Sequence, residues 1–103
     1  MGKAILVALI LMFAIPGTSL AIEGPTLEYG KALFESKDLG TKQRSCSSCH
    51  PEGKGLDQTG DFNDSELKDI INACIRDAMG GTLFATDAQE LDALLNYVRH
   101  LSQ

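Results

Sequence analysis

Cys46-Ser47-Ser48-Cys49-His50 is the stretch of sequence that decides how the rest of the chain is organised. Two thiols stand three positions apart and an imidazole follows at once, so one helical turn would present all three along one edge of a flat ligand. This spacing is typical of c-type haem attachment, in which two thiols form thioethers and the histidine reaches the iron. We therefore predict haem c with thioethers at Cys46 and Cys49, and His50 as the proximal iron ligand.

Three other kinds of site also use paired cysteines: a redox-active pair, one half of a zinc site, and a structural disulfide. A zinc site needs two more ligands at short spacing, yet Cys74 and His100 each stand alone. A thioredoxin-like pair would need strands and helices in alternation around the motif, and no strand pattern is present. These alternatives stay open beside the haem interpretation.

The N-terminal residues have the pattern of a secretory signal peptide at 1–21. Lys3 precedes an apolar run from Ala4 to Ile15, and small residues end the segment at Ala21. The run is shorter than the roughly 20 residues that a membrane-spanning helix needs. We expect cleavage and export to the periplasm, with an uncleaved membrane anchor as the alternative, and one domain over 22–103.

The charge and size of this domain bound its function. The chain has 9 Lys and Arg against 14 Asp and Glu, and Lys3 leaves with the signal. This acidic balance disfavours nucleic acid and anionic lipid as partners, and favours a redox protein with a basic docking face. We expect the domain to be a monomer. A domain of roughly 80 residues has a thin core, which a large apolar cofactor would complete.

Helix signals lie before and at the motif. Thr26 is placed to cap a first helix that carries Gly30 and Phe34. Because glycine inside a helix costs about 1 kcal/mol relative to alanine, we expect another helix to pack closely over Gly30. Ser45 is placed to cap the turn that holds the motif, and Leu56 follows in a glycine-rich stretch as a side chain to pack on the haem.

Two more helices are predicted after the motif, each from a capping box. Asn63 with Glu66 opens one that ends before the Gly80-Gly81 pair, and Thr86 with Gln89 opens another. Both have an apolar stripe at helical spacing, formed by Leu67, Ile70, Ile71, Cys74, Ile75 and Ala78 in the first and by Leu91, Leu94, Leu95, Val98 and Leu101 in the second. No strand pattern, repeat or linker appears, so the fold class is all-α.

The order of these parts resembles the small class I c-type cytochromes, over nearly all of Thr26 to Leu101. The matching features are Gly30 with Phe34, the haem motif, a methionine-bearing loop at Met79, and Tyr97 in the last helix. The resemblance implies a cytochrome c fold with three main helices and a short haem-motif turn wrapped around one covalent haem, the first and last helices crossing at Gly30.

The chain departs from that family in two respects. Members usually carry a later proline whose carbonyl accepts the second ring N–H of the histidine, whereas no proline follows Pro51 here. Another carbonyl must therefore serve His50. The stretch between His50 and Met79 is also shorter than is usual in the family.

The distal iron ligand has several candidates. Met79 is the first choice, because it lies in a glycine-flanked loop at a position similar to the family's ligand. Cys74 is the alternative, and His100 or an open site is the remaining one. Cys74 and Met79 are separated by about 140° around a helix, so both face the iron only if the helix ends before Met79.

Electron transfer, rather than enzymatic catalysis, is the function that the resemblance implies. A narrower likeness, in the segments 71–76 and 79–83, is to sulfur-oxidation cytochromes and thiosulfate dehydrogenases, in which a cysteine can be the distal ligand. The alternative function is therefore a haem subunit or small enzyme of sulfur-compound (thiosulfate) oxidation with Cys74 at the iron. A sensor that binds a diatomic gas at an open site is the third possibility.

Overall fold

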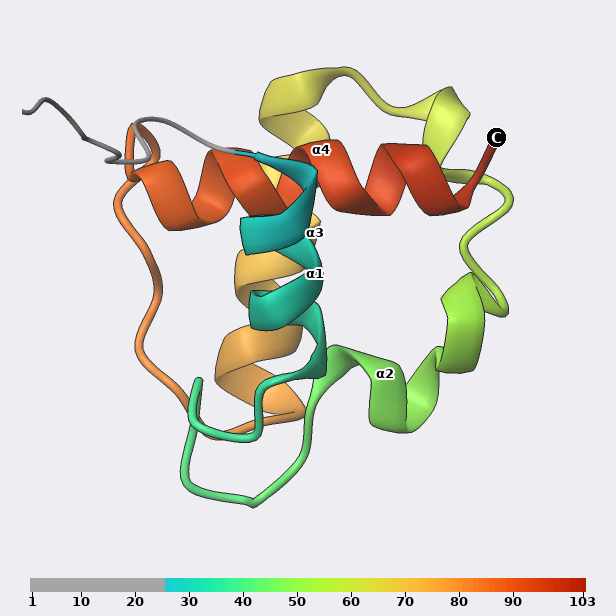
Figure 1. Cartoon of the computed structure of the whole chain (residues 1–103). Helices are drawn as coiled ribbons and strands as arrows, with labels where there is room; N and C mark the ends of the chain where they lie inside the picture. Colours follow the sequence, from blue (N-terminus) through green and yellow to red (C-terminus); the bar gives the residue numbers. More distant parts are fainter. Residues whose placement is uncertain (1–25) are drawn as a thin grey trace, which may run out of the picture.

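The computed structural model describes residues 26–103, so the predicted signal peptide and residues 22–25 lie outside the described part. Four α-helices occur there: α1 (Leu27–Glu35), α2 (Cys46–Cys49), α3 (Asp64–Asp77) and α4 (Gln89–Leu101). Short 3₁₀ turns lie at Pro51–Gly53 and Thr59–Asp61. Within residues 26–103 there is no strand, only an isolated bridge between Gly40 and Gly81. The described part is thus all-α, with three longer helices and a short one at the motif (Figure 1).

Side-chain caps explain where α1 and α3 begin. The Thr26 hydroxyl accepts from Tyr29 N at 3.0 Å. Asn63 and Glu66 form both halves of the predicted capping box, at 2.8 and 3.0 Å. These caps satisfy amide groups that the first helical turn leaves without partners, so both predicted starts are confirmed.

The predicted start of α4 is wrong. The helix begins at Gln89, its N-cap is Ala88, and no side chain caps it. Ala88 N donates to Ala85 O at 3.0 Å, which closes a turn over Thr86 and delays the helix. The carbonyl of Thr86 instead accepts from Lys68 Nζ at 2.9 Å, so this residue ties its loop to α3 rather than opening α4.

The close approach predicted at Gly30 is confirmed, and α4 is the helix that approaches. Figure 1 shows α1 crossing α4. A methyl group on Gly30 would lie 2.7 Å from Tyr97 Cβ and would overlap the carbonyl oxygen of Ala93. Phe34, one turn later, packs edge-on against Tyr97 with ring centroids 5.3 Å apart. The two helices therefore meet backbone to backbone, beside an aromatic pair.

The buried core joins α3 and α4 beneath this crossing. Leu91, Leu94 and Ile75 are fully buried at its centre. The loop between α3 and α4 is held by Asn72, whose amide donates to Phe84 O and accepts from Phe84 N, both at 3.0 Å. No helix in the described residues is long and apolar enough to traverse a bilayer.

Candidate functional site

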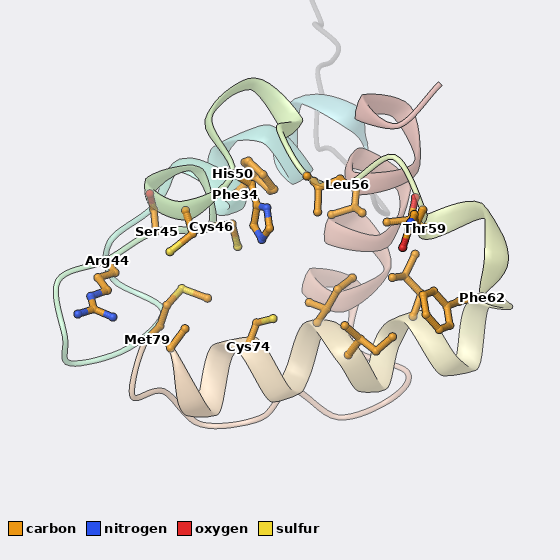
Figure 2. Close-up of a pocket in the computed structure, with 18 residues that line it drawn as sticks. Phe34, Arg44, Ser45, Cys46, His50, Leu56, Thr59, Phe62, Cys74 and Met79 are labelled. Atoms are coloured by element: carbon orange, nitrogen blue, oxygen red, sulfur yellow. The ribbon is translucent and has the colours of Figure 1, made fainter.

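A cavity of about 370 Å³ opens between α2, α3 and the loops that join them. It brings together six of the seven residues that the sequence singled out for the haem and its iron: Cys46, Cys49, His50, Leu56, Cys74 and Met79. Figure 2 shows His50, Cys46, Met79 and Cys74 around one opening. His100, the remaining candidate, does not line the cavity; it is exposed and stacks on Tyr97.

Hydrogen bonds at both ends of the α2 turn hold the motif in place. Ser45, only 4% exposed, caps it by accepting from Ser48 N at 3.2 Å, and the Ser48 hydroxyl accepts from Ser45 N at 3.0 Å. His50 closes the turn by donating from its backbone to Cys46 O at 2.9 Å. The reciprocal bonds confirm Ser45 as the cap and hold Cys46, Cys49 and His50 on one wall of the cavity.

The imidazole of His50 has a backbone carbonyl as its hydrogen-bond partner, as expected from the lack of a proline after Pro51. Its Nδ1 donates to Lys54 O at 2.8 Å. Between His50 and Lys54 the backbone turns back toward the imidazole through two residues in the left-handed conformation, Glu52 with φ of 55° and Gly53 with φ of 82°. Gly55, at φ 87°, lies beside the ring, so that a methyl group there would be 3.4 Å from Nδ1. Fixing Nδ1–H in this way leaves Nε2 as the nitrogen available to a metal.

The end of α3 allows both sulfur candidates to reach the cavity. The helix ends at Asp77 with Ala78 as its C-cap, before Met79, which meets the condition set by their angular separation. Met79 is 2% exposed, whereas Cys74 is exposed to the cavity and solvent. Leu67, Ile71 and Ile75 form a buried row of α3, and Ile70 and Cys74, continued by the C-cap Ala78, form a more exposed row beside it. The exposed row lines the cavity together with Leu67 and Ile71.

Burial raises the pKa of two of the cavity thiols, Cys46 and Cys74. The pKa of Cys46 is raised to about 11, chiefly by burial and next by the proximity of Cys74. Burial also raises the pKa of Cys74, with Asp77 as the second cause. All three cysteines of the described residues are free of disulfide bonds.

Several cavity residues were not foreseen from the sequence. Phe62 and Ile70 line it while remaining 39% exposed, although both are large and apolar. Thr59 and Gln58 contribute from the loop before α3, and Arg44 is the only side chain with a permanent charge in the lining. The one available signal was local: Phe62 directly precedes the Asn63 cap, where an apolar residue commonly packs on the helix.

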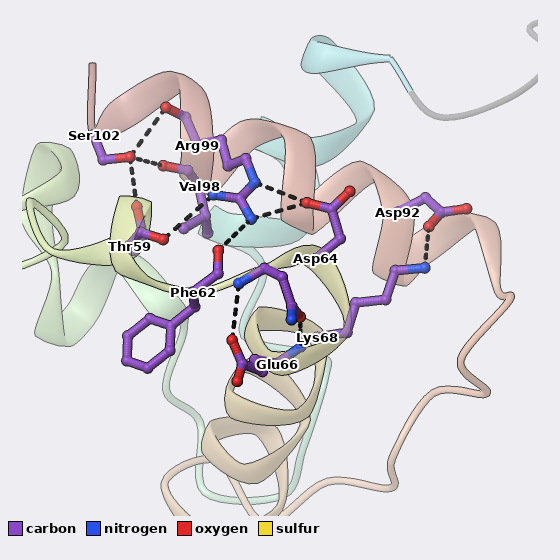
Figure 3. A network of polar contacts seen from close by, with 10 residues as sticks. Thr59, Phe62, Asp64, Glu66, Lys68, Asp92, Val98, Arg99 and Ser102 are labelled. Carbon is purple, nitrogen blue, oxygen red and sulfur yellow. Dashed lines mark hydrogen bonds and ion pairs between the residues drawn. The ribbon is translucent and has the colours of Figure 1, made fainter.

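A polar cluster closes one end of the cavity. Arg99 of α4 donates to Asp64 Oδ1 at 2.8 Å, to Phe62 O at 2.9 Å and to Thr59 O at 3.3 Å (Figure 3). The Thr59 hydroxyl also donates to Ser102 Oγ at 2.6 Å. One guanidinium thus fixes the segment that carries Thr59 and Phe62 into the lining.

Between residues 26 and 103, no three His, Cys, Asp or Glu side chains come together as a metal-binding group. A zinc site of four protein ligands is therefore not found in that part of the chain. No family model, curated protein or solved structure matches this chain.

Proposed function

We propose that this chain is an exported monohaem c-type cytochrome with the class I cytochrome c fold, and that it carries single electrons between redox partners. The observation that carries the proposal is the position of the motif. Cys46, Cys49 and His50 lie on one capped turn and line the same cavity as two sulfur side chains from the end of α3.

The residues around the cavity fit a covalent haem. The volume lies within the range of about 300–1,000 Å³ that cofactor pockets occupy. Phe62 and Ile70 expose apolar surface to it, which a flat apolar group would cover. His50 and one sulfur side chain would suffice as protein ligands, because a haem iron receives four nitrogens from its own macrocycle.

Bound haem would supply an iron that alternates between the ferrous and ferric states. The chain's own residues would attach the haem, bind its iron and orient the histidine ligand. Cys46 and Cys49 would fix the ring to α2, and His50 would bind the iron through Nε2, with Lys54 O orienting the imidazole. Leu56, Ile70 and Cys74 line the cavity and would pack against the ring. A Met79 thioether would raise the reduction potential, and a Cys74 thiolate would lower it.

The exposed position of Cys74 in the cavity favours a second candidate function, oxidation of a sulfur compound such as thiosulfate at the iron. This function requires thiosulfate to reduce the holoprotein, and requires Cys74→Ser to abolish that reduction. A holoprotein that exchanges electrons with a basic redox protein but ignores thiosulfate would support the carrier instead.

The test is expression of the full chain together with a c-type maturation system. We expect a red protein, heavier than its polypeptide by one haem, whose colour survives denaturation because the bond is covalent. Cys46→Ala with Cys49→Ala should lose the covalent haem, whereas Cys74→Ser should keep it. A colourless wild-type protein of polypeptide mass would contradict the proposal.

A further inference from the structure

We propose that residues 39–42, which we call the strap, position Met79 and thereby select its thioether over the Cys74 thiolate as distal ligand. This inference rests on the proposed haem function. The strap lies just before the haem motif in sequence, yet it packs against the chain that follows α3. One segment therefore connects the proximal and distal walls of the cavity.

Four hydrogen bonds join the strap to the three carbonyls around Met79. Lys42 N donates to Met79 O at 3.0 Å, and Thr41 N donates to Gly80 O at 3.3 Å. The Thr41 hydroxyl donates to the same Gly80 carbonyl at 3.3 Å, and Lys42 Nζ donates to Asp77 O at 3.0 Å. The amides of this segment bond back to the end of α3, with Met79 N donating to Cys74 O at 3.2 Å and Gly81 N to Ile75 O at 2.8 Å, whereas the strap binds its carbonyls.

Two glycines make this approach possible. Gly40 and Gly81 pair in the isolated bridge, and a methyl group on Gly40 would overlap the Met79 carbonyl. A methyl group on Gly81 would overlap Leu39 O in the same way. The strap and the Met79 segment are therefore in backbone contact, and no side chain larger than hydrogen fits between them.

The two sulfur candidates depend on the strap to different degrees. Cys74 lies inside α3, and helical bonds hold its backbone whether or not the strap is in place. Met79 lies beyond the helix end, where Gly80 turns left-handed at φ 70°. Loosening the strap would therefore free the Met79 and Gly80 carbonyls and loosen Met79, which would keep only its single amide bond to Cys74 O, while Cys74 would keep its place in the helix. Gly40 and Thr41 are positioning residues in this account.

The test compares strap variants of the holoprotein by spectroscopy. In the wild type we expect a ferric thioether-to-iron absorption in the near infrared, which Met79→Ala removes. Gly40→Ala should lower this band by more than half. It should also let imidazole displace the distal ligand about tenfold more readily, the size of effect expected from losing one or two hydrogen bonds. Gly60→Ala is the matched control, because a methyl group there meets nothing within 4 Å.

If Gly40→Ala yields no holoprotein, Thr41→Val is the milder variant, since it removes only the hydroxyl bond to Gly80. It should weaken the thioether band, and Thr41→Ser should restore it. A full band and unchanged imidazole affinity in the strap variant would overturn the inference, as would a wild-type band that Met79→Ala leaves intact. In both cases the haem would still be attached, whereas a colourless wild type would contradict the proposed function itself.

Discussion

Replacing Gly30 by alanine gives a sharp test of the contact between α1 and α4, because the sign of the effect separates packing from helix propensity. On propensity alone, glycine to alanine inside a helix stabilises by about 1 kcal/mol. Here the new methyl group would lie 2.7 Å from Tyr97 Cβ, against an ordinary carbon–carbon contact of about 3.5–4.0 Å. The helices must separate or tilt, because the nearest atoms include the Ala93 backbone, which has no rotamer to adopt.

Overpacking of this kind costs about 1–3 kcal/mol, and loosening of the Phe34–Tyr97 edge contact adds about 0.5–1.5 kcal/mol. Set against the gain in propensity of about 1 kcal/mol, we expect a net loss of about 0.5–3.5 kcal/mol in the free energy of unfolding. For a domain of this size that loss lowers the Tm by roughly 2–28 °C.

The assay is thermal and urea unfolding of the holoprotein, monitored in the far-ultraviolet circular dichroism. Gly60→Ala adds the same methyl group where nothing lies within 4 Å, and should leave stability unchanged or slightly raised. A Gly30→Ala protein as stable as the wild type, or more stable, would refute the claim that backbone contact with α4 is what requires glycine.

Two further predictions concern the walls of the cavity. Arg99→Met removes the bonds to Thr59 O, Phe62 O and Asp64, so we expect a loss of about 1–3 kcal/mol in urea unfolding, whereas Arg76→Met, whose pair with Asp77 is exposed, should have no measurable effect. In the polypeptide without haem, burial raises the pKa of Cys46 from 9.0 to about 11. The unfolded thiol therefore ionises first, so the contribution of Cys46 to stability should be fully present below pH 9 and should be lost as the pH rises toward 11. A Cys46→Ser polypeptide should show a smaller decline, because only Cys74 then has a raised pKa, and an equal decline in both would contradict the assignment.

The helices were largely predictable because their signals are local. Thr26, Ser45 and the Asn63–Glu66 pair act on amides within three residues of themselves, so the sequence contains both partners of each bond. The start of α4 was not predictable in the same way. Thr86 and Gln89 have the spacing of a capping box, but the long-range bond from Lys68 to the Thr86 carbonyl and the turn before Ala88 override it.

The features of the site also divide into those with a local sequence signal and those that depend on long-range contacts. The spacing of Cys46, Cys49 and His50 and the end of α3 are local features, and they sufficed to name these three residues together with Cys74 and Met79 as residues that meet in the cavity. The partner of His50 Nδ1 could be anticipated only as some carbonyl, because its identity depends on two left-handed residues, Glu52 and Gly53. The strap and the Arg99 cluster join residues 35 to 40 positions apart, and no local pattern indicates such pairs.

The apolar stripe of α3 gives the strongest physical reason to expect a large ligand. This stripe is wider than the packing of the core requires, because Leu67, Ile71 and Ile75 are already buried in the protein. Ile70 and Cys74 extend the stripe toward the cavity, where they stay exposed beside Phe62. Exposed apolar surface on two walls of one concave site is costly in water, at about 25 cal/mol per Å². A flat apolar ring held at Cys46 and Cys49, as we propose, would cover both walls at once. It would explain both the spacing of the two cysteines and the second apolar row of α3.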